Sequence, residues 1–499
     1  MSDFKRQHPV AAITNVLKSL RELLIPIIIV YFLGGSNEGN FFTNPVYITG
    51  FLTILLVFSV IQWFRFVYKV EDDEIKVEQG VIVRKRSYIP KHRIQVINIS
   101  SGVIQRMFGL VSLNVQTAGG NTPGTTISAL TRTEAEWIKE KLSKDEDAVI
   151  EEETKTEEAP ANFALSWKNL FIAGTTSGSF GIALSIVGTI ASQMQFVVED
   201  DAVVDYAESL FQTELSFIIA VVIGLILFAW VLSIVGTVLA YANFAVFKKR
   251  KEILISRGLF EKKQISIPYS RIQAVRIQEG ILRQPFGFCT VYVDSAGYGE
   301  ESGKSATLFP LINKKHVWDF IRVMVPEYDQ KAEKLRPPKR ALRRYIIRAL
   351  IPVFLVGALL YAFTDFSHYI LLLVPAGVLL GYLRFKVAAV GVNDDSMIIR
   401  YRNLAKTTAI VKRYRIQAVS AWDNWFQRRL SLKSLSVNIA SSDTGATFQA
   451  KDFEENKMLD LVEWVEPYYA SKEKHVYEDS DSEVPQSGSR ITDYLDPGL

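Results

Sequence analysis

Long apolar segments alternate with polar stretches along this chain of 499 residues. A helix needs about 20 consecutive apolar residues to cross the hydrocarbon core of a bilayer. Six segments approach that length, and short links join them in pairs. They cover residues 23–35, 45–64, 167–197, 215–247, 345–363 and 369–383. The first carries Pro26 and spans only if its helix begins near Leu17. The pattern predicts six transmembrane helices in three hairpins.

One motif recurs in the polar stretches. Ile-Pro-x-x-Arg-Ile-Gln begins at Ile89 and again at Ile267, and Arg-Ile-Gln-Ala-Val returns at Arg415. Offsets of 178 and 322 residues superpose the second and third copies on the first without a gap, far beyond the motif itself. Each copy follows an apolar pair. The chain is therefore expected to use one unit, a hairpin followed by a domain, three times.

Each copy is rich in short strand-like runs. In the first copy, β-branched residues alternate in part over 74–78, 81–88, 110–117 and 125–130. An amphipathic helix is expected at the end of each copy, over 133–142, 314–325 and 453–465. Each copy is thus predicted to be a small β-sandwich or open barrel closed by one C-terminal helix, which gives an α+β membrane protein.

The expected domain boundaries follow from these patterns. They are hairpin 1 at 17–64, domain 1 at 65–142, an acidic linker at 143–161, hairpin 2 at 167–247, domain 2 at 248–328, a basic linker at 329–344, hairpin 3 at 345–385, domain 3 at 386–469 and a disordered acidic tail at 470–499.

The motifs carry a family resemblance. A membrane hairpin, a strand, Ile-Pro-x-x-Arg-Ile-Gln, then Gln-Arg-x-Phe-Gly-Leu and an Ala-Gly turn resemble the bacterial pleckstrin-homology-like (PH-like) domain, once called the membrane-flanked domain. Three copies on six segments are similar to the YdbT-like membrane proteins. The resemblance implies a PH-like fold, a cell-membrane location and no established biochemical activity. The third copy has Lys412 in place of proline and Leu430-Ser431 in place of Phe-Gly, so its shared loop is expected to be degenerate.

Charge predicts the orientation. Lys and Arg cluster beside the hairpins, for example at 248–251 and 336–344, whereas the hairpin loops carry none. The positive-inside rule then places the PH-like domains and both termini in the cytoplasm of a multi-pass protein of the cell membrane. The two basic runs are interpreted as topology signals, with anionic lipid head groups as the alternative ligand.

Chemistry is sparse in this sequence. Cys289 stands alone and the five histidines are scattered, so neither a metal site nor a disulfide is expected. Residues 297–305 lack the first glycine of a P-loop, because Tyr298 stands there. No catalytic constellation, metal or cofactor is predicted, and the protein is not expected to be an enzyme. Arg348 is the one clear charge inside an apolar segment, and we expect it to reach the membrane interface.

The repeated Arg-Ile-Gln has two interpretations. Its isoleucine is a core residue in both. The flanking residues either brace a neighbouring strand or bind a partner through the planar guanidinium. These candidate interaction residues are Arg93, Gln95, Arg271, Gln273, Arg415 and Gln417.

The leading functional hypothesis is a scaffold that presents three PH-like domains for protein assembly, in envelope defence or membrane homeostasis by analogy. The expected partners are membrane lipids, a second copy of the chain (a homo-oligomer) or a single-domain PH-like membrane protein, and no nucleic acid. The alternative is transport of lipid or small solutes by the six helices.

Overall fold

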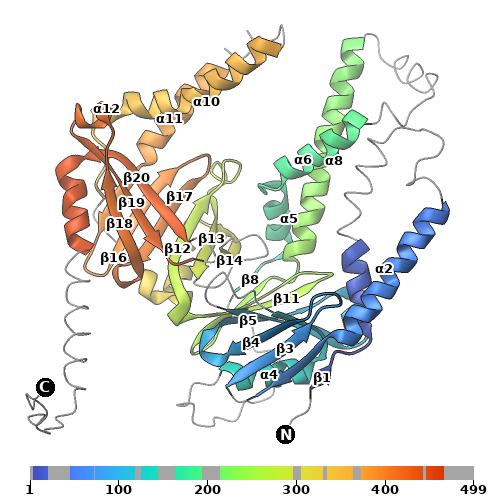
Figure 1. The fold of residues 1–499 in the computed structure, drawn as a ribbon. Coiled ribbons are helices and arrows are strands. Elements are labelled where there is room, and N and C mark those ends of the chain that lie inside the picture. Colours follow the sequence, from blue (N-terminus) through green and yellow to red (C-terminus); the bar gives the residue numbers. More distant parts are fainter. Residues whose placement is uncertain are drawn as a thin grey trace, which may run out of the picture. The chain divides into compact units, whose positions relative to one another are not determined.

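The computed structural model describes residues 4–20, 45–71, 73–117, 125–143, 163–193, 214–295, 305–329, 334–363, 373–441 and 445–465 (Figure 1). The chain forms two compact units. The first comprises Met1–Gln330, Arg402–Ile410 and Ile439–Ala446, and the second comprises Lys331–Tyr401, Val411–Asn438 and Thr447–Leu499.

The first copy of the repeat contains two antiparallel sheets. One has the order β1-β2-β3-β4, with β1 at Lys5–Arg6, β2 at Val67–Val70, β3 at Glu74–Gln79 and β4 at Lys85–Pro90. The other contains β5 (Ile94–Ser101), β6 (Leu110–Thr117) and β7 (Thr125–Thr131). In β3 the fully buried Ile75 and Val77 alternate with half-exposed polar residues, as a half-buried strand requires. Helix α4 (Arg132–Ser143) ends the copy where the sequence predicted a helix.

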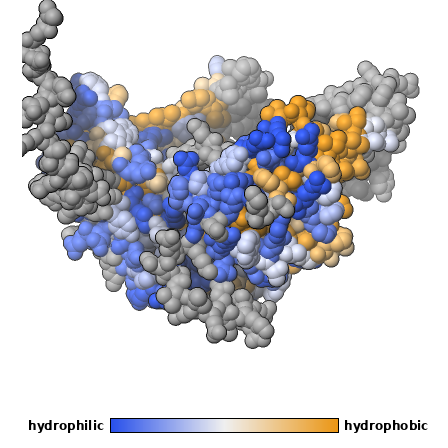
Figure 2. Space-filling model, turned by 60° about the horizontal axis from the view of Figure 1, so that its bottom comes forward, coloured by the Kyte–Doolittle hydropathy of each residue, from blue (hydrophilic) through white to orange (hydrophobic). Residues whose placement is uncertain are grey.

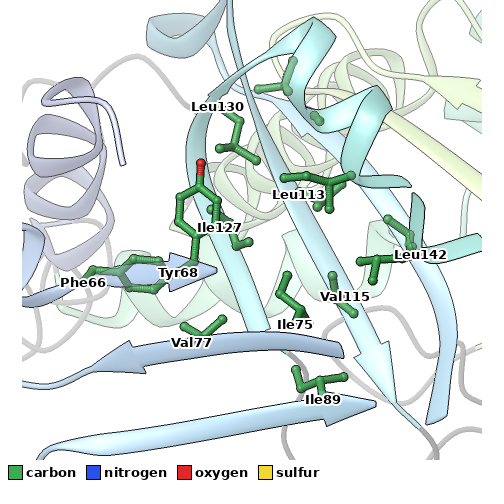
Figure 3. Packing of buried hydrophobic residues seen from close by; sticks show 14 residues of the cluster. Phe66, Tyr68, Ile75, Val77, Ile89, Leu113, Val115, Ile127, Leu130 and Leu142 are labelled. Carbon is green, nitrogen blue, oxygen red and sulfur yellow. The ribbon is translucent and has the colours of Figure 1, made fainter. Parts of the chain in front are cut away.

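The core of this copy lies between its two sheets. Figure 3 shows Ile75, Val77 and Ile89 from the first sheet facing Leu113 and Ile127 from the second, and all five are fully buried. A polar contact joins this core to α4. The Tyr68 hydroxyl donates a hydrogen bond to Glu134 Oε1 at 3.0 Å, and burial together with this carboxylate raises the pKa of Tyr68. Strands and helix therefore form one folded body.

The second copy continues the sheet of the first. Its strands are β8 (Phe163–Ala164), β9 (Ala245–Lys248), β10 (Glu252–Arg257), β11 (Lys262–Pro268), β12 (Ile272–Glu279), β13 (Phe288–Ser295) and β14 (Ala306–Asn313), and they precede helix α9 (Val317–Met324). The order β7-β6-β5-β11-β10-β9-β8 makes one seven-stranded sheet from both copies. Beyond it, β14-β13-β12 are followed by β17 (Lys406–Lys412).

The third copy repeats these elements. Strands β15 (Ala389–Val392) and β16 (Ser396–Arg402) pair antiparallel. A three-stranded sheet has the order β18-β19-β20, with β18 at Ile416–Trp422, β19 at Leu432–Ile439 and β20 at Ala446–Glu454. A helix over 455–465 follows β20. The sheet-rich, PH-like character predicted from the sequence is thus confirmed.

The prediction of six transmembrane helices in three hairpins is wrong for the described part of the chain. One helix there is long and apolar enough to cross a bilayer, at Ile219–Tyr241 within α8 (Glu214–Tyr241). A second crossing arises only if α5 (Trp167–Thr175) and α6 (Phe180–Gln193), bent by 55° at their break, count as one span.

The other apolar segments fail for identifiable reasons. Helix α10 (Leu342–Phe363) carries Arg343, Arg344 and Arg348 in its first two turns. Helix α11 (Val374–Val387) has only 14 residues, and its last turn carries Arg384 and Lys386. In α2 (Pro45–Arg65) the apolar stretch is the shorter Thr49–Arg65. Apolar composition alone therefore overestimated the spans.

Helix α8 does not behave as the core helix of a soluble protein. Only 11% of its apolar window is buried, and Phe228 is 57% exposed. Figure 2 shows hydrophobic side chains gathered in patches beside a largely hydrophilic face. A large exposed apolar surface of this kind needs lipid or protein to cover it.

Several sequence predictions fall outside the described residues. They concern the first apolar segment at 23–35, the hairpin loops, most of the acidic linker at 143–161, the stretch 297–304 and the tail at 470–499.

Candidate functional site

The repeated motif forms the same corner in each copy. A 3-10 turn, at Lys91–Arg93, Tyr269–Arg271 and Arg413–Arg415, leads from one strand directly into the next. The residue before it is extended, with φ −66° at Pro90, −62° at Pro268 and −74° at Lys412. The lysine therefore adopts the backbone that proline favours, and the third copy keeps the shape of the corner.

The six candidate residues are not equivalent. Gln273 is buried and donates a hydrogen bond to the Arg271 carbonyl at 3.2 Å, which braces the corner. Gln417, its counterpart in the third copy, is exposed. The guanidinium of Arg415 lies 4.7 Å from the ring centroid of Tyr414. The Gln273 bond braces the corner of the second copy, and an interaction role for the six residues stays a prediction.

Arg93 is exposed at the corner of the first copy, and the side chain of Gln95 is not described. Each copy carries its own motif on its own corner. In the first two copies the motif lies at the start of β5 and β12, the strands that pair with a strand of the next copy.

The first joint between copies is a strand pair. Strand β11 runs antiparallel to β5, with Lys262 opposite Ser101, Lys263 opposite Ser100 and Gln264 opposite Ile99. Backbone N–H and C=O groups at two sheet edges thus satisfy each other.

Side chains hold the same joint. Arg106 Nη1 donates to the Leu259 carbonyl at 2.8 Å, and Lys139 Nζ donates to Ser266 Oγ at 2.8 Å. The short helix α3 (Val103–Met107) thus binds the turn before β11, and helix α4 binds β11 itself.

The second joint uses equivalent positions. Strand β17 is the neighbour of β12, and Lys406 Nζ lies 2.6 Å from Glu279 Oε1. Burial opposes ionisation of Glu279, but Lys406 and Lys314 outweigh it and lower the pKa of this carboxyl. Gln284, the counterpart of Arg106, accepts a hydrogen bond from Arg402.

The printed contacts of the two joints lie at equivalent positions of the repeat. Moving from Ser101 to Glu279 adds 178 residues, the offset between the first two copies. Moving from Lys262 to Lys406 adds 144, the difference between the offsets 322 and 178. The Glu279–Lys406 ion pair therefore occupies the place of the Ser101–Lys262 pair. Sequence reasoning missed this pair, although the repeat offsets contain the signal.

A buried ionic cluster lies in the second unit. The carboxylate of Asp452 is fully buried and lies 2.8 Å from Arg344 Nε and 2.7 Å from Arg348 Nη2, both on α10. Gln427 Nε2 also donates to Asp452 Oδ1 at 2.8 Å. Arg348, the charge inside an apolar segment, thus pairs with this carboxylate of the sheet domain, and its reach to the membrane interface stays a prediction.

The position of Gln427 carries polar anchors in all copies. Gln105 donates to Ser112 Oγ at 2.6 Å within the first domain. Arg283, the counterpart in the second copy, donates to the Ala173 carbonyl of α5 at 3.3 Å. Burial lowers the pKa of Arg283. This position ties the sheet domain directly to α5 in the second copy, and to α10 through Asp452 in the third.

Exposed aromatic side chains lie within three residues of these anchors in the sequence. Phe108 is 56% exposed, Phe286 is 65% exposed and Phe426 is 64% exposed, each on the short helix or turn after the first strand of the second sheet. Within the second unit, Asn424 caps the short helix α12 (Trp425–Arg428) and accepts a hydrogen bond from Arg344 of α10. The exposed Phe426 of α12 thus lies on an element that is bonded to the first turn of α10.

The described residues offer little chemistry beyond binding. They contain no group of three His, Cys, Asp or Glu side chains that could hold a metal ion. Cys289 is fully buried, and burial raises the pKa of its thiol to about 12, so it is not a nucleophile at neutral pH.

These features define a protein of PH-like domains, and comparison with known proteins gives the family. The chain belongs to the bacterial PH domain family, which matches residues 19–146, 182–324 and 346–468. It is 36% identical over 487 residues to the UPF0699 transmembrane protein YdbT of Bacillus subtilis (strain 168), covering 93% of this chain and 98% of that protein. No solved structure matches the chain. The chain is thus a YdbT-like membrane protein with three bacterial PH-like domains.

Proposed function

We propose that this membrane protein is a non-enzymatic scaffold of the cell envelope that presents its PH-like domains for protein assembly. The observation that carries the proposal is the β5–β11 pair, in which one domain extends the sheet of the next. A fold that already associates through strand edges is suited to add strands from other proteins.

The proposal includes a cytoplasmic position against the inner membrane surface. Two features support it: the Lys and Arg clusters beside the apolar segments, and the exposed aromatic residues Phe108, Phe286 and Phe426. Aromatic side chains favour the boundary between head groups and hydrocarbon. Transport has no comparable support, because it rested on six spanning helices.

Photo-crosslinking in living cells tests the scaffold. A photoreactive phenylalanine analogue replaces Tyr88 on β4 or Trp422 on β18, which are 54% and 41% exposed. Trp137 on α4, 47% exposed, is the matched control away from strand edges. We expect discrete protein adducts from both edge positions and none from position 137. Absence of protein adducts at both edges would contradict the scaffold.

A further inference from the structure

Two sheet edges remain outside the joints between copies. By the repeat offsets, β18 is the counterpart of β5 and β12, and β4 is the counterpart of β11 and β17. The pairs β5–β11 and β12–β17 form the internal joints. Among the described strands, β4 and β18 each lie at the edge of a sheet. The chain thus carries two strands that could form a further joint of the same kind, β4 in its first copy and β18 in its third.

The exposure of β18 differs from that of its counterpart. In β12, Gln273 and Ala274 are buried, at 6% and 0% exposure. In β18 the equivalent Gln417 and Ala418 are exposed. The two strands share the sequence Arg-Ile-Gln-Ala-Val, but β12 has β17 beside it whereas β18 is an outer strand of its sheet.

Strand β4 shows the same contrast. Tyr88 is 54% exposed, whereas its counterparts Ser266 on β11 and Ile410 on β17 are 5% and 0% exposed. A large aromatic side chain on an outer edge strand is a typical contact residue for an added strand.

The register of the internal joints predicts how β4 and β18 would meet. Shifting the Ser101–Lys262 and Glu279–Lys406 positions by the repeat offsets places Asp423 opposite Arg84. Asp423 is acidic like its counterpart Glu279, and Arg84 is basic like its counterpart Lys406. The same register places Val419 opposite Tyr88, a favourable pair of β-branched and aromatic residues.

We infer that a second copy of this chain is the partner, with β18 of one copy pairing antiparallel with β4 of the next. A second copy is the expected partner because β4 and β18 are the counterparts of strands that already pair with each other within the chain. The contact is heterologous, so copies assemble head to tail into a ring or a row in the membrane plane. This inference rests on the proposed scaffold and names its partner.

Disulfide trapping tests the register. Ser87→Cys is placed in one tagged full-length chain and Ser420→Cys in a second chain with another tag, because the register sets these residues opposite each other. Directly opposed residues on antiparallel strands lie about 4.5–5.5 Å apart, within the range that a disulfide bridges. Native Cys289 stays in both chains, since it is fully buried.

The two chains are coexpressed, oxidised in membranes and captured through one tag. We expect a reducible dimer that carries both tags. The matched control pairs Ser87→Cys with Thr447→Cys, which lies on β20 at the other side of the three-stranded sheet. No more dimer from the Ser420→Cys pair than from this control would overturn the inference.

A chain that carries Ser87→Cys and Ser420→Cys together tests the other occupant. A disulfide formed only within single chains would show that β18 covers β4 of its own chain and would also overturn the inference. The experiments distinguish a wrong partner from a wrong scaffold proposal. If photo-adducts form at Tyr88 and Trp422 with another protein while the disulfide dimer is absent, the scaffold stands and its partner is different.

Discussion

At the scale of the residue, one backbone conformation recurs in each copy, at the end of the short helix or turn before the middle strand of the second sheet. Gly109 and Gly287 have φ 67° and 69°, and Ser431 takes their place at φ 50°. A side chain at positive φ is strained, whereas glycine is not. The third copy departs from the shared sequence at this loop, but its backbone keeps the same conformation. The expectation of a degenerate loop is therefore wrong for the backbone.

This strain gives the first prediction. Ser431→Gly should raise the free energy of unfolding by about 0.5–1 kcal/mol, because glycine relieves the strained conformation. The reverse change, Gly287→Ser, should lower it by a similar amount. Denaturant unfolding of both variants in detergent measures the two shifts. If Ser431→Gly instead lowered the free energy of unfolding, the serine side chain would stabilise the fold by more than its backbone strain destabilises it.

The buried carboxylate of Asp452 gives a second prediction. Asp452→Asn keeps the size and tolerates the residue's positive φ of 59°, but it leaves Arg344 and Arg348 without their carboxylate. Breaking a buried ion pair should destabilise the protein by about 3 kcal/mol. The control, Asp319→Asn, removes a pair with Arg322 in which both side chains are more than 60% exposed. It should cost less than about 1 kcal/mol. Equal thermal shifts for the two variants would contradict a structural role for the cluster.

At the scale of the element, the strand pairs between copies hold the domains in register. The side chains at the second joint are nearly buried, with Glu279 and Lys406 only 12% and 15% exposed. A partly buried, charge-assisted hydrogen bond contributes more than an exposed pair does. The joint should therefore depend on the ionised state of Glu279.

The pH dependence of this pair gives a third prediction. The pKa of Glu279 in the folded state lies below its value in the unfolded state, about 4.3. Ionised Glu279 therefore stabilises the fold above about pH 4.3, and this stabilisation is lost as the pH falls through the folded-state pKa. Glu279→Gln should lower the free energy of unfolding by about 1–2 kcal/mol at pH 7. The difference from the natural protein should vanish as the pH falls below the folded-state pKa.

Unfolding midpoints measured from pH 7 to pH 3 test that curve. Glu261→Gln is the matched control, since Glu261 is 50% exposed and lies 3.6 Å from Lys263. It should have little effect at any pH. A loss of stability by Glu279→Gln that is independent of pH would contradict the electrostatic explanation.

At the scale of the whole molecule, the sequence predicted the repeated β-rich domain well. Period-two runs and shared turn residues are local signals, and β3, β4 and α4 formed close to the expected residues. The repeat offsets also contained the joints, because Glu279 and Asp423 keep their sign at equivalent positions.

The spans and the joints were harder to predict. Apolar composition does not reveal the break between α5 and α6 or the binding of Arg348 to Asp452. A joint between copies depends on which strand lies beside β5, and residues of β5 and β11 are about 160 positions apart in sequence. Pairing at that separation leaves no local pattern.

The central claim is that strand edges join the PH-like domains, and the outer edge of β18 joins one chain to the next. Amide hydrogen exchange of Ile416–Trp422 in bilayers tests it most directly, at several ratios of protein to lipid. The account predicts that β18 becomes protected as the protein becomes denser, while β12 stays protected throughout. Exchange of β18 that does not depend on protein density, with β12 protected, would contradict joining between chains. Rapid exchange of β12 itself would contradict the joints within the chain.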